Sequence, residues 1–257
     1  MITALTVAGS DSVGGAGIQA DIKAMSSLGV HATCVITAVT AQNTCRVSDI
    51  FPVPLDVIEK QFDAVMEDCD IRAVKTGMLY NSDITKFVAG KLKDFDIPLI
   101  IDPVLIAGVG GSLAGDGVAD AVKKHLMPLC ELITPNRFEG EVLAGMKINS
   151  EEDAIRACEI IGRDGASVYL KGGHMDTANV IDYLYKDFEI KKIEYPRLRR
   201  SGHGSGCTLS SFITANRAKR SDIVSSVIKS REMIQKSIDT QYFIGKGDEV
   251  VNPIIRL

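Results

Sequence analysis

Residues 201–212 read SGHGSGCTLSSF, where three glycines alternate with small or polar residues before an apolar helical pattern begins. Glycines such as Gly204 and Gly206 adopt backbone angles that other residues resist, and successive amides in such a turn can surround an anion. The helix that follows adds the partial positive charge of its N-terminus. A P-loop would place a lysine after its glycines, whereas this chain has Cys207 there. The stretch therefore predicts an anion-binding loop with a thiol at the first turn of a helix.

The rest of the chain alternates short apolar runs with segments of helical periodicity, which is typical of an α/β fold with a mostly parallel sheet. We predict strands at residues 2–9, 31–39, 71–77, 98–104, 130–135 and 167–173, and helices at residues 18–29, 55–68, 82–94, 117–127, 137–145, 150–165, 207–219 and 221–240. Ser82 and Ser150 are the expected caps of two of these helices. Residues 180–196 predict a hairpin that turns at Lys186–Asp187 and forms an antiparallel edge. No linker or internal repeat interrupts residues 1–257, so we expect one domain.

Polar residues gather where the predicted strands end. The segments at those ends read AGSDSVGGAG, VTAQNT, KTGM, DPVLIAG, TPNRFE, KGGH and SGHGSGC. In open α/β sheets, ligands bind beyond the carboxyl ends of the parallel strands. The sequence therefore predicts one polar site at that edge of the sheet. The glycine-rich residues 108–117 are expected to form a surface loop.

Composition and charge narrow the range of functions. Hydrophobic residues make up 46% of the chain and charged residues 24%, which permits a sizeable core. A formal net charge of −4 gives no electrostatic reason to bind nucleic acid or an anionic membrane. The chain shows no secretory signal and no apolar stretch long enough to span a bilayer, so we expect a cytoplasmic protein. The six cysteines form no Cys-x-x-Cys pair, which predicts free thiols and no zinc site.

Phosphoryl transfer would give Cys207 a role. The glycine loop would stabilise the charge of the transferred group, which is the main work of such enzymes. The acceptor alcohol also loses a proton, which a group at the centre of the loop could accept. A thiol at a helix start ionises more readily than a free cysteine, so Cys207 is the predicted base. The alternative is a tight turn with a structural cysteine, with which a Gly-Ser-Gly stretch alone is equally consistent.

Eight motifs together resemble the ribokinase superfamily, and more closely the hydroxymethylpyrimidine and phosphomethylpyrimidine kinases of thiamin biosynthesis. They are AGSDSVGGAGIQADIKA (8–24), TAVTAQNT (37–44), KTGML (75–79), DPV (102–104), TPNRFE (134–139), KGGH (171–174), HGSGCTLSS (203–211) and GKGDEVVNP (245–253). The resemblance covers essentially the whole chain. It implies a ribokinase-like three-layer α/β/α fold, a small antiparallel hairpin at the edge of the sheet, Mg²⁺ with ATP as co-substrate, and a homodimer.

The resemblance assigns substrate-binding roles to six residues. Gln42 matches the residue that hydrogen-bonds the aminopyrimidine, and its amide offers a donor and an acceptor to a ring nitrogen beside an amino group. Met78 and Val104 would pack against the ring. The residues that would line its pocket are Gly9, Ala16 and Asp21.

The phosphate side of the site is assigned in the same way. The resemblance implies that Asp102 and Glu139 act on Mg²⁺, largely through water, since Mg²⁺ keeps several waters. Lys171 and Asn136 would reach the nucleotide phosphates, and His203 would lie near the nucleotide. The anion hole would consist of Gly204, Gly206 and Cys207. Ser205 would bind the nucleotide, keeping the hydroxyl where the family usually has threonine.

Each assignment has a purely structural alternative. The alternatives are a turn former at Asp102, a helix cap at Asn136, solvated side chains at Glu139 and Lys171, and a core residue at Met78. Gln42 has the weakest alternative, because nothing in a tight turn demands glutamine. Joint placement of these residues at strand ends favours the functional interpretation.

The predicted function is ATP-dependent phosphorylation of 4-amino-5-hydroxymethyl-2-methylpyrimidine and then of its monophosphate. A pyridoxal kinase of the same superfamily is one alternative, because some members share the Gly-x-Gly-Cys ending. Gln42 and the loop at residues 9–21 favour the aminopyrimidine. A non-catalytic pyrimidine sensor is the other alternative, and it would have no need for phosphate-transfer residues such as Lys171 and Cys207. A dehydrogenase is disfavoured, because residues 9–17 lack the Gly-x-Gly-x-x-Gly spacing.

Overall fold

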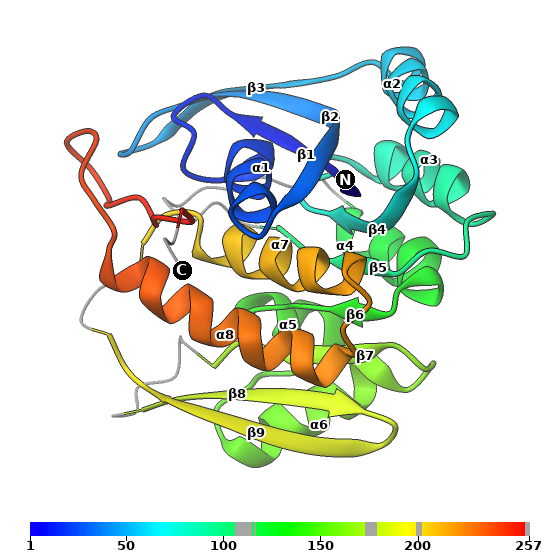
Figure 1. Cartoon of the computed structure of the whole chain (residues 1–257). Helices are drawn as coiled ribbons and strands as arrows, with labels where there is room; N and C mark the ends of the chain where they lie inside the picture. Colours follow the sequence, from blue (N-terminus) through cyan, green and yellow to red (C-terminus); the bar gives the residue numbers. More distant parts are fainter. Residues whose placement is uncertain (106–114, 116, 173–178, 199–201, 255–257) are drawn as a thin grey trace.

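A computed structural model describes residues 1–105, 115, 117–172, 179–198 and 202–254. Within that part of the chain, one sheet has the strand order β3-β2-β1-β4-β5-β6-β7-β8-β9 (Figure 1). The strands are β1 (Ile2–Asp11), β2 (Val30–Gln42), β3 (Val47–Pro52), β4 (Ile71–Thr76), β5 (Leu99–Ile101), β6 (Leu132–Ile133), β7 (Ser167–Leu170), β8 (Asn179–Lys186) and β9 (Glu189–Pro196). Strands β2, β1, β4, β5, β6 and β7 run parallel to one another, while β3, β8 and β9 pair antiparallel. The mostly parallel sheet and its antiparallel edge hairpin are thus as predicted.

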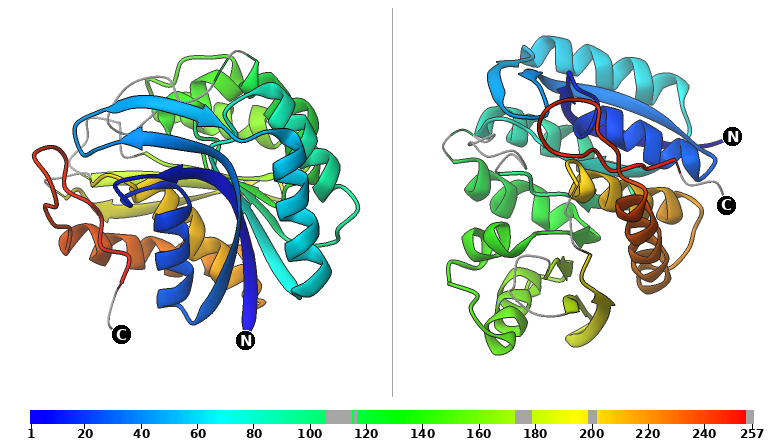
Figure 2. Two further views of the ribbon diagram at one scale, coloured as in Figure 1. Left: turned by 90° about the horizontal axis from the view of Figure 1, so that it is seen from above. Right: turned by 90° about the vertical axis from the view of Figure 1, so that its left-hand side faces the viewer.

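Helices cover both faces of the sheet. The helices are α1 (Gly17–Ser27), α2 (Leu55–Asp68), α3 (Ser82–Leu92), α4 (Val118–Ala121), α5 (Arg137–Ala144), α6 (Glu151–Gly162), α7 (Ser205–Ala218) and α8 (Ile223–Asp239), with the short helices η1 (Val122–Leu126) and η2 (Met127–Leu129). Helices α1, α7 and α8 lie on one face, and α2 to α6 lie on the other (Figure 2). One core cluster packs α7 and α8 against the sheet, and a larger cluster packs α2 to α6 against the opposite face. The result is the predicted three-layer α/β/α arrangement.

Burial explains which strands are central. Strands β5 and β6 read LII and LI, and every one of these side chains is buried, as both faces of a parallel strand require. Strand β9 lies at the edge and carries exposed Glu189, Lys191 and Lys192, charges that discourage pairing with another chain. Helix α7 is buried along almost its whole length, which fixes its N-terminus against the sheet.

Several local expectations differ from the structure. Strand β3 was not predicted, because its short, largely exposed sequence VSDIFP carries little apolar alternation. Asn81 caps α3 in place of Ser82, since its side chain accepts a hydrogen bond from the N–H of Ile84. The helix expected at residues 117–127 is a short α4 followed by a π turn and a 3-10 turn, and Pro128 stands at the start of the 3-10 turn. Most of the glycine-rich segment 108–117 lies outside the described residues.

The end of the described chain closes over the carboxyl edge of β2. The segment around Val250 pairs with Tyr242 and with His203. Its glycines approach the turn after β2, where the N–H of Gly247 donates to Oγ1 of Thr44 at 3.0 Å. A β-carbon on Gly247 would lie only 2.1 Å from the carbonyl oxygen of Thr44, so this contact requires glycine. The C-terminal segment therefore fixes the turn that carries Gln42.

Candidate active site

The glycine loop lies against two side chains at the ends of β5 and β7, two strands with β6 between them. Gly204, with φ of 85°, precedes Ser205 at the start of α7. A β-carbon on Gly206 would lie 3.4 Å from Nζ of Lys171 and 3.9 Å from Oδ2 of Asp102. Lys171 follows β7 and Asp102 follows β5. The structure thus brings the predicted anion loop, a cation and a carboxylate together at the carboxyl edge of the sheet.

Asp102 and Lys171 form a largely buried ion pair. Nζ of Lys171 donates to Oδ1 of Asp102 at 3.3 Å, and the hydroxyl of Ser210 donates to Oδ2 at 3.2 Å. Burial works to raise the pKa of Asp102, but the charges of Lys171 and Lys75 outweigh it and lower the pKa. Burial works to lower the pKa of Lys171, but Asp102 and Glu139 raise it. Both groups therefore carry charge at neutral pH, and Lys171 is no solvated strand end.

Asn136 and Glu139 form a capping box at the start of α5. The N–H of Glu139 donates to Oδ1 of Asn136 at 3.0 Å, and the N–H of Asn136 donates to Oε2 of Glu139 at 2.8 Å. The structural alternative for Asn136, a helix cap, is therefore confirmed. Glu139 is only 4% exposed, so it is not a solvated residue. Burial raises the pKa of Glu139 to about 7, with Asp102 adding to the rise and Lys171 opposing it.

The electrostatics of Cys207 contradict the expectation of a readily ionised thiol. Cys207 lies in the first turn of α7, and the backbone of Gly17 at the start of α1 also works to lower the pKa of its thiol, so two helix N-termini act on it. Burial nevertheless raises the pKa of the thiol to about 12, against the stabilising charge of Lys75, while Asp102 and Asp21 add to the rise. Desolvation is the reason for the difference, because burial disfavours a charged sulfur more than the helix starts favour it.

Asp21 does not line the pocket as predicted. Its side chain has no solvent exposure, and all its oxygens have partners. Lys75 donates to Oδ1 at 2.7 Å, Ser211 donates to the same oxygen at 2.7 Å, and Thr6 donates to Oδ2 at 2.6 Å. Asp21 therefore connects α1, β4, α7 and β1 beneath the site, where a free carboxylate would cost several kcal/mol.

Three of the predicted substrate residues do lie together. A β-carbon on Gly9 would lie 3.0 Å from Sδ of Met78, and one on Gly17 would lie 2.4 Å from the carbonyl oxygen of Gly9. Ala16 precedes α1, and its N–H donates to Oδ2 of Asp11 at 2.8 Å. Met78 is 6% exposed, which also agrees with its structural alternative as a core residue. The end of β1, the start of α1 and Met78 thus form one wall.

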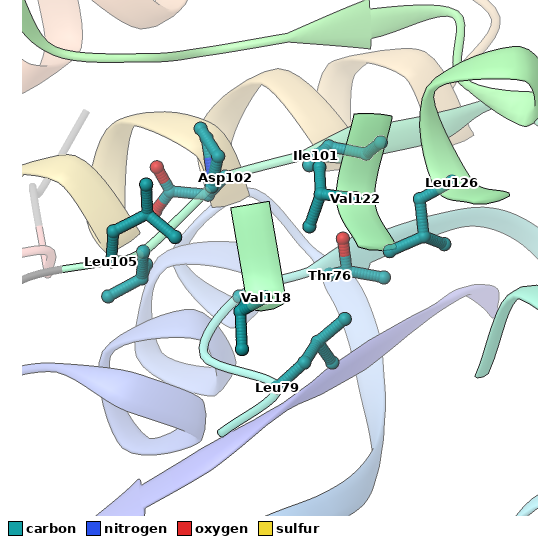
Figure 3. Close-up of a pocket in the computed structure, with 11 residues that line it drawn as sticks. Thr76, Leu79, Ile101, Asp102, Leu105, Val118, Val122 and Leu126 are labelled. Carbon is teal, nitrogen blue, oxygen red and sulfur yellow. The ribbon is translucent and has the colours of Figure 1, made fainter. Parts of the chain in front are cut away.

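Val104 follows the end of β5, beside Asp102 and Pro103. A small apolar cavity behind the end of β5 is lined by Val104, Leu79 and Val118 among others. Asp102 is also one of the residues that line this cavity (Figure 3). The roles of Met78 and Val104 as contacts of the ring stay predictions.

Gln42 lies at the end of β2 beside the loop that follows β1. Its backbone N–H donates to Oγ of Ser12 at 2.8 Å, and that hydroxyl donates to the carbonyl oxygen of Gln42 at 2.7 Å. Its side-chain Nε2 lies 3.1 Å from Nε2 of His203, and the same ring nitrogen lies 3.1 Å from Oδ2 of Asp11. His203 thus contacts both Gln42 and Asp11, and its place near the nucleotide stays a prediction.

Three residues of the site were missed from the sequence. Lys75 gave a signal, because a lysine inside an apolar strand is rarely buried without a partner. Asp11 gave a weaker one, since aspartate before glycines often accepts hydrogen bonds from the amides of its own loop. It does so here from Val13, Gly15 and Ala16. Ser210 gave no signal in the sequence, because its contact with Asp102 depends on how α7 packs.

The donor set fits a hard divalent cation that arrives with phosphates. In the described part of the chain, no group of three or more His, Cys, Asp or Glu side chains is placed to hold a metal ion. Asp102 nevertheless supplies a carboxylate beside the anion loop, and Glu139 supplies a second one that interacts with Asp102 and Lys171. Mg²⁺ is commonly held by one or two carboxylates together with waters and substrate phosphates. The carboxylates of Asp102 and Glu139 would therefore be sufficient to hold Mg²⁺ together with waters and substrate phosphates.

None of the described helices is long and apolar enough to cross a membrane.

Two helix starts, a lysine and a carboxylate meet at one edge of a mostly parallel sheet, an arrangement that stabilises a phosphoryl group during transfer. Together with the three-layer fold, this arrangement places the protein among the ribokinase-like kinases of small molecules.

Comparison with known proteins gives the family. Residues 11–252 match the family model described as phosphomethylpyrimidine kinase, and the chain belongs to this family. It is 40% identical to the hydroxymethylpyrimidine/phosphomethylpyrimidine kinase of Bacillus subtilis, over 97% of this chain and 93% of that protein. The phosphomethylpyrimidine kinase of Clostridium difficile superimposes with a TM-score of 0.83 at 39% identity, covering 93% of this chain and 100% of that one. The ADP complex of Bacillus subtilis pyridoxal kinase superimposes with a TM-score of 0.91 at 31% identity, covering 98% of this chain and 97% of that one. The predicted kinase class and fold are thereby confirmed.

Proposed function

We propose that this kinase transfers the γ-phosphoryl group of ATP to the hydroxyl of 4-amino-5-hydroxymethyl-2-methylpyrimidine, and then to the phosphate of the product. The observation that carries this proposal is the position of Gly206, whose α-carbon faces Nζ of Lys171 and Oδ2 of Asp102. A transferring phosphoryl group needs amide donors and a cation around its oxygens, and both are present there. The family to which the chain belongs supports the choice of substrate.

On the phosphate side, the amides of the loop at Gly204, Ser205 and Gly206 would hold the transferring group at the N-terminus of α7. Lys171 would bind the nucleotide phosphates, moving from its contact with Asp102 toward them. Asn136 would hold the start of α5 beside Lys171, with which its backbone pairs. We thus assign Asn136 a supporting position.

Asp102 and Glu139 are the proposed Mg²⁺ residues. The bound ion would neutralise charge on the nucleotide phosphates. The low pKa of Asp102 keeps one full negative charge available for a cation. Glu139 would supply further oxygen ligands, through water in either protonation state.

On the substrate side, Gln42 would read the edge of the pyrimidine, and the wall of Gly9, Ala16 and Met78 would receive the ring. Val104 would contribute beside the end of β5. Cys207 remains the proposed proton acceptor. It accepts a proton only as the thiolate, and the charge of Lys75 favours that form.

A substrate panel tests the proposal. The purified protein is supplied with Mg²⁺ and ATP and with the aminopyrimidine alcohol, its monophosphate, pyridoxal or ribose, and ADP formation is followed. We expect kcat/KM to be highest for the two pyrimidines. Lys171→Met should lose turnover with every substrate, whereas Lys86→Met, which removes an exposed lysine, should not. A higher kcat/KM for pyridoxal would establish the second candidate, which the likeness to pyridoxal kinases favours. A homodimer, a single domain and a cytoplasmic location stay predictions.

A further inference from the structure

His203 is buried between the two residues that organise the substrate side of the site. Its side chain is 3% exposed, and its Nε2 lies 3.1 Å both from Oδ2 of Asp11 and from Nε2 of Gln42. Its other ring nitrogen, Nδ1, is buried without a hydrogen-bond partner among the described residues. All polar contacts of this ring therefore run through one nitrogen atom.

Asp11 determines whether Nε2 of His203 carries a hydrogen. Burial works to raise the pKa of Asp11, but hydrogen bonds from His203 and from the N–H groups of Ala16 and Val13 outweigh it and lower the pKa. The group is thus an ionised carboxylate, which only accepts hydrogen bonds. Nε2 of His203 must then carry a hydrogen, because two lone pairs 3.1 Å apart would repel each other. With that hydrogen, Nε2 has no lone pair left for an N–H of Gln42.

Thr40 leads to the same orientation of the Gln42 amide. Its contact is with Oε1, the other terminal atom of that amide. Its hydroxyl donates to the carbonyl oxygen of Ser10 at 3.1 Å, and its oxygen lies 3.4 Å from Oε1 of Gln42. A hydroxyl has one hydrogen, so the oxygen of Thr40 is left as an acceptor. When the amide of Gln42 is turned over, its nitrogen donates toward Thr40, and its oxygen shares the single Nε2 hydrogen of His203 with the carboxylate of Asp11.

We propose that His203, held by Asp11, is a positioning residue that fixes the amide of Gln42 with its oxygen toward His203 and its nitrogen toward Thr40. The inference rests on the proposed function only for the identity of the ring that Gln42 reads. The order of donor and acceptor presented to the substrate is thereby set by the protein before the substrate arrives.

This order selects a substrate edge of matching chemistry. A ring nitrogen with a lone pair accepts from the amide N–H, while the neighbouring exocyclic amino group donates to the amide oxygen. The 4-oxo analogue of the same alcohol offers an N–H in the ring and an oxygen outside it, which is the reverse order. Accommodating it would require the amide to turn over and would leave Nε2 of His203 facing a donor. Sites built on buried hydrogen bonds reject such mismatches strongly.

The hydrogen on His203 is tested directly in the free protein. Nuclear magnetic resonance of the imidazole nitrogens, assigned by comparison with His203→Gln, distinguishes a protonated from an unprotonated Nε2. We expect a protonated Nε2 at neutral pH. An unprotonated Nε2 would overturn the inference. Because no substrate is involved, this result is independent of whether the proposed function holds.

The consequence is tested by binding selectivity. Calorimetry with the 4-amino alcohol and its 4-oxo analogue gives the ratio of their affinities for the parent, for His203→Gln, which keeps a side-chain donor, and for His203→Leu, which does not. We expect the ratio to fall by about tenfold or more in His203→Leu, because the amide is then free to turn over, and to be largely retained in His203→Gln. His125→Leu, a substitution in η1 outside the site, is the matched control. An unchanged ratio in His203→Leu would contradict the inference, whereas a parent that binds neither compound would contradict the proposed function.

Discussion

Nζ of Lys75 donates a hydrogen bond to Oδ1 of Asp21 at 2.7 Å, and neither side chain has any solvent exposure. Burial works to lower the pKa of Lys75, but Asp21 raises it above the ordinary value, so the pair is charged. The pair joins β4 to α1 beneath the loops that hold Cys207. A buried pair of this kind is expensive to form and still more expensive to break on one side.

Removing one member of this pair should destabilise the protein strongly. We expect Lys75→Met to lower the free energy of unfolding by about 3–5 kcal/mol, because it leaves the carboxylate of Asp21 buried without its cation. Urea unfolding measures this loss, and adding Asp21→Asn to the same chain should recover part of it. The control is Lys60→Met, whose pair with Asp56 is exposed at 76% and 67%, and a much smaller loss is expected there. Equal losses in the two variants would show that the buried pair contributes little.

Alanine at the two glycines of the anion loop should affect different properties, stability at Gly204 and activity at Gly206. At Gly204, φ is 85° and a β-carbon would lie 1.8 Å from the carbonyl oxygen of Gly15, so Gly204→Ala should lose stability. At Gly206, a β-carbon would meet only Nζ of Lys171 and the carboxylate of Asp102 at ordinary contact distances. Gly206→Ala should therefore keep the parent's stability and lose about 10²-fold in kcat/KM, since the methyl group displaces the phosphoryl group. Thermal unfolding and steady-state kinetics separate the two effects, and a fully active Gly206→Ala would contradict the anion-loop assignment.

The thiol of Cys207 should be slow to alkylate in the free protein. With a pKa of about 12, its thiolate fraction near neutral pH is small. We expect its reaction with iodoacetamide at about pH 8 to be roughly a thousandfold slower than that of a free cysteine, and to rise about tenfold per pH unit up to about pH 9.5. Mass spectrometry of the Cys207 peptide, with exposed Cys45 as the internal standard, measures both rates. Equal rates at about pH 8 would mean that the helix starts outweigh desolvation after all.

Loss of the thiol tests the proposed base. Cys207→Ala should bind the pyrimidine normally and lose about 10²–10⁴-fold in kcat, the usual range for general base catalysis. If the thiolate is required, kcat of the parent should increase with pH over the range where the protein is stable, because ionisation of Cys207 is incomplete there, and kcat of the variant should not. A kcat within a few-fold of the parent would make Cys207 a small residue that fills the loop.

Metal removal tests the two carboxylates. Activity should vanish in excess chelator and return when Mg²⁺ is added, because Asp102 and Glu139 are suited to a hard cation. Asp102→Asn should require more Mg²⁺ for half-maximal rate, as measured by ADP formation against free Mg²⁺. Full turnover in chelator would contradict the assignment of both residues.

Much of the fold could be predicted from local sequence. Helix α2 occupies residues 55–68, as its apolar spacing predicted, and Ser150 caps α6 as expected, through a capping box with Asp153. The hairpin of β8 and β9 turns at Asp187 and Phe188, one residue beyond the predicted Lys186–Asp187. These features depend on neighbours a few residues away, so periodicity and capping residues were sufficient. Strand β3 was not predicted from the sequence, because its pairing with β2 stabilises it more than its own sequence does.

The sequence by itself determined the alternation of strands and helices, the glycine loop at the start of α7 and the gathering of polar residues at the carboxyl ends of strands. Only the tertiary structure decided how those residues are used. Asp21 and Lys75 are 54 residues apart, and Gln42 and His203 are 161 apart, so no local pattern shows that they touch. The physical reason is that burial and charge act through space: packing around Cys207 raises its pKa, although its place at a helix start predicted the opposite.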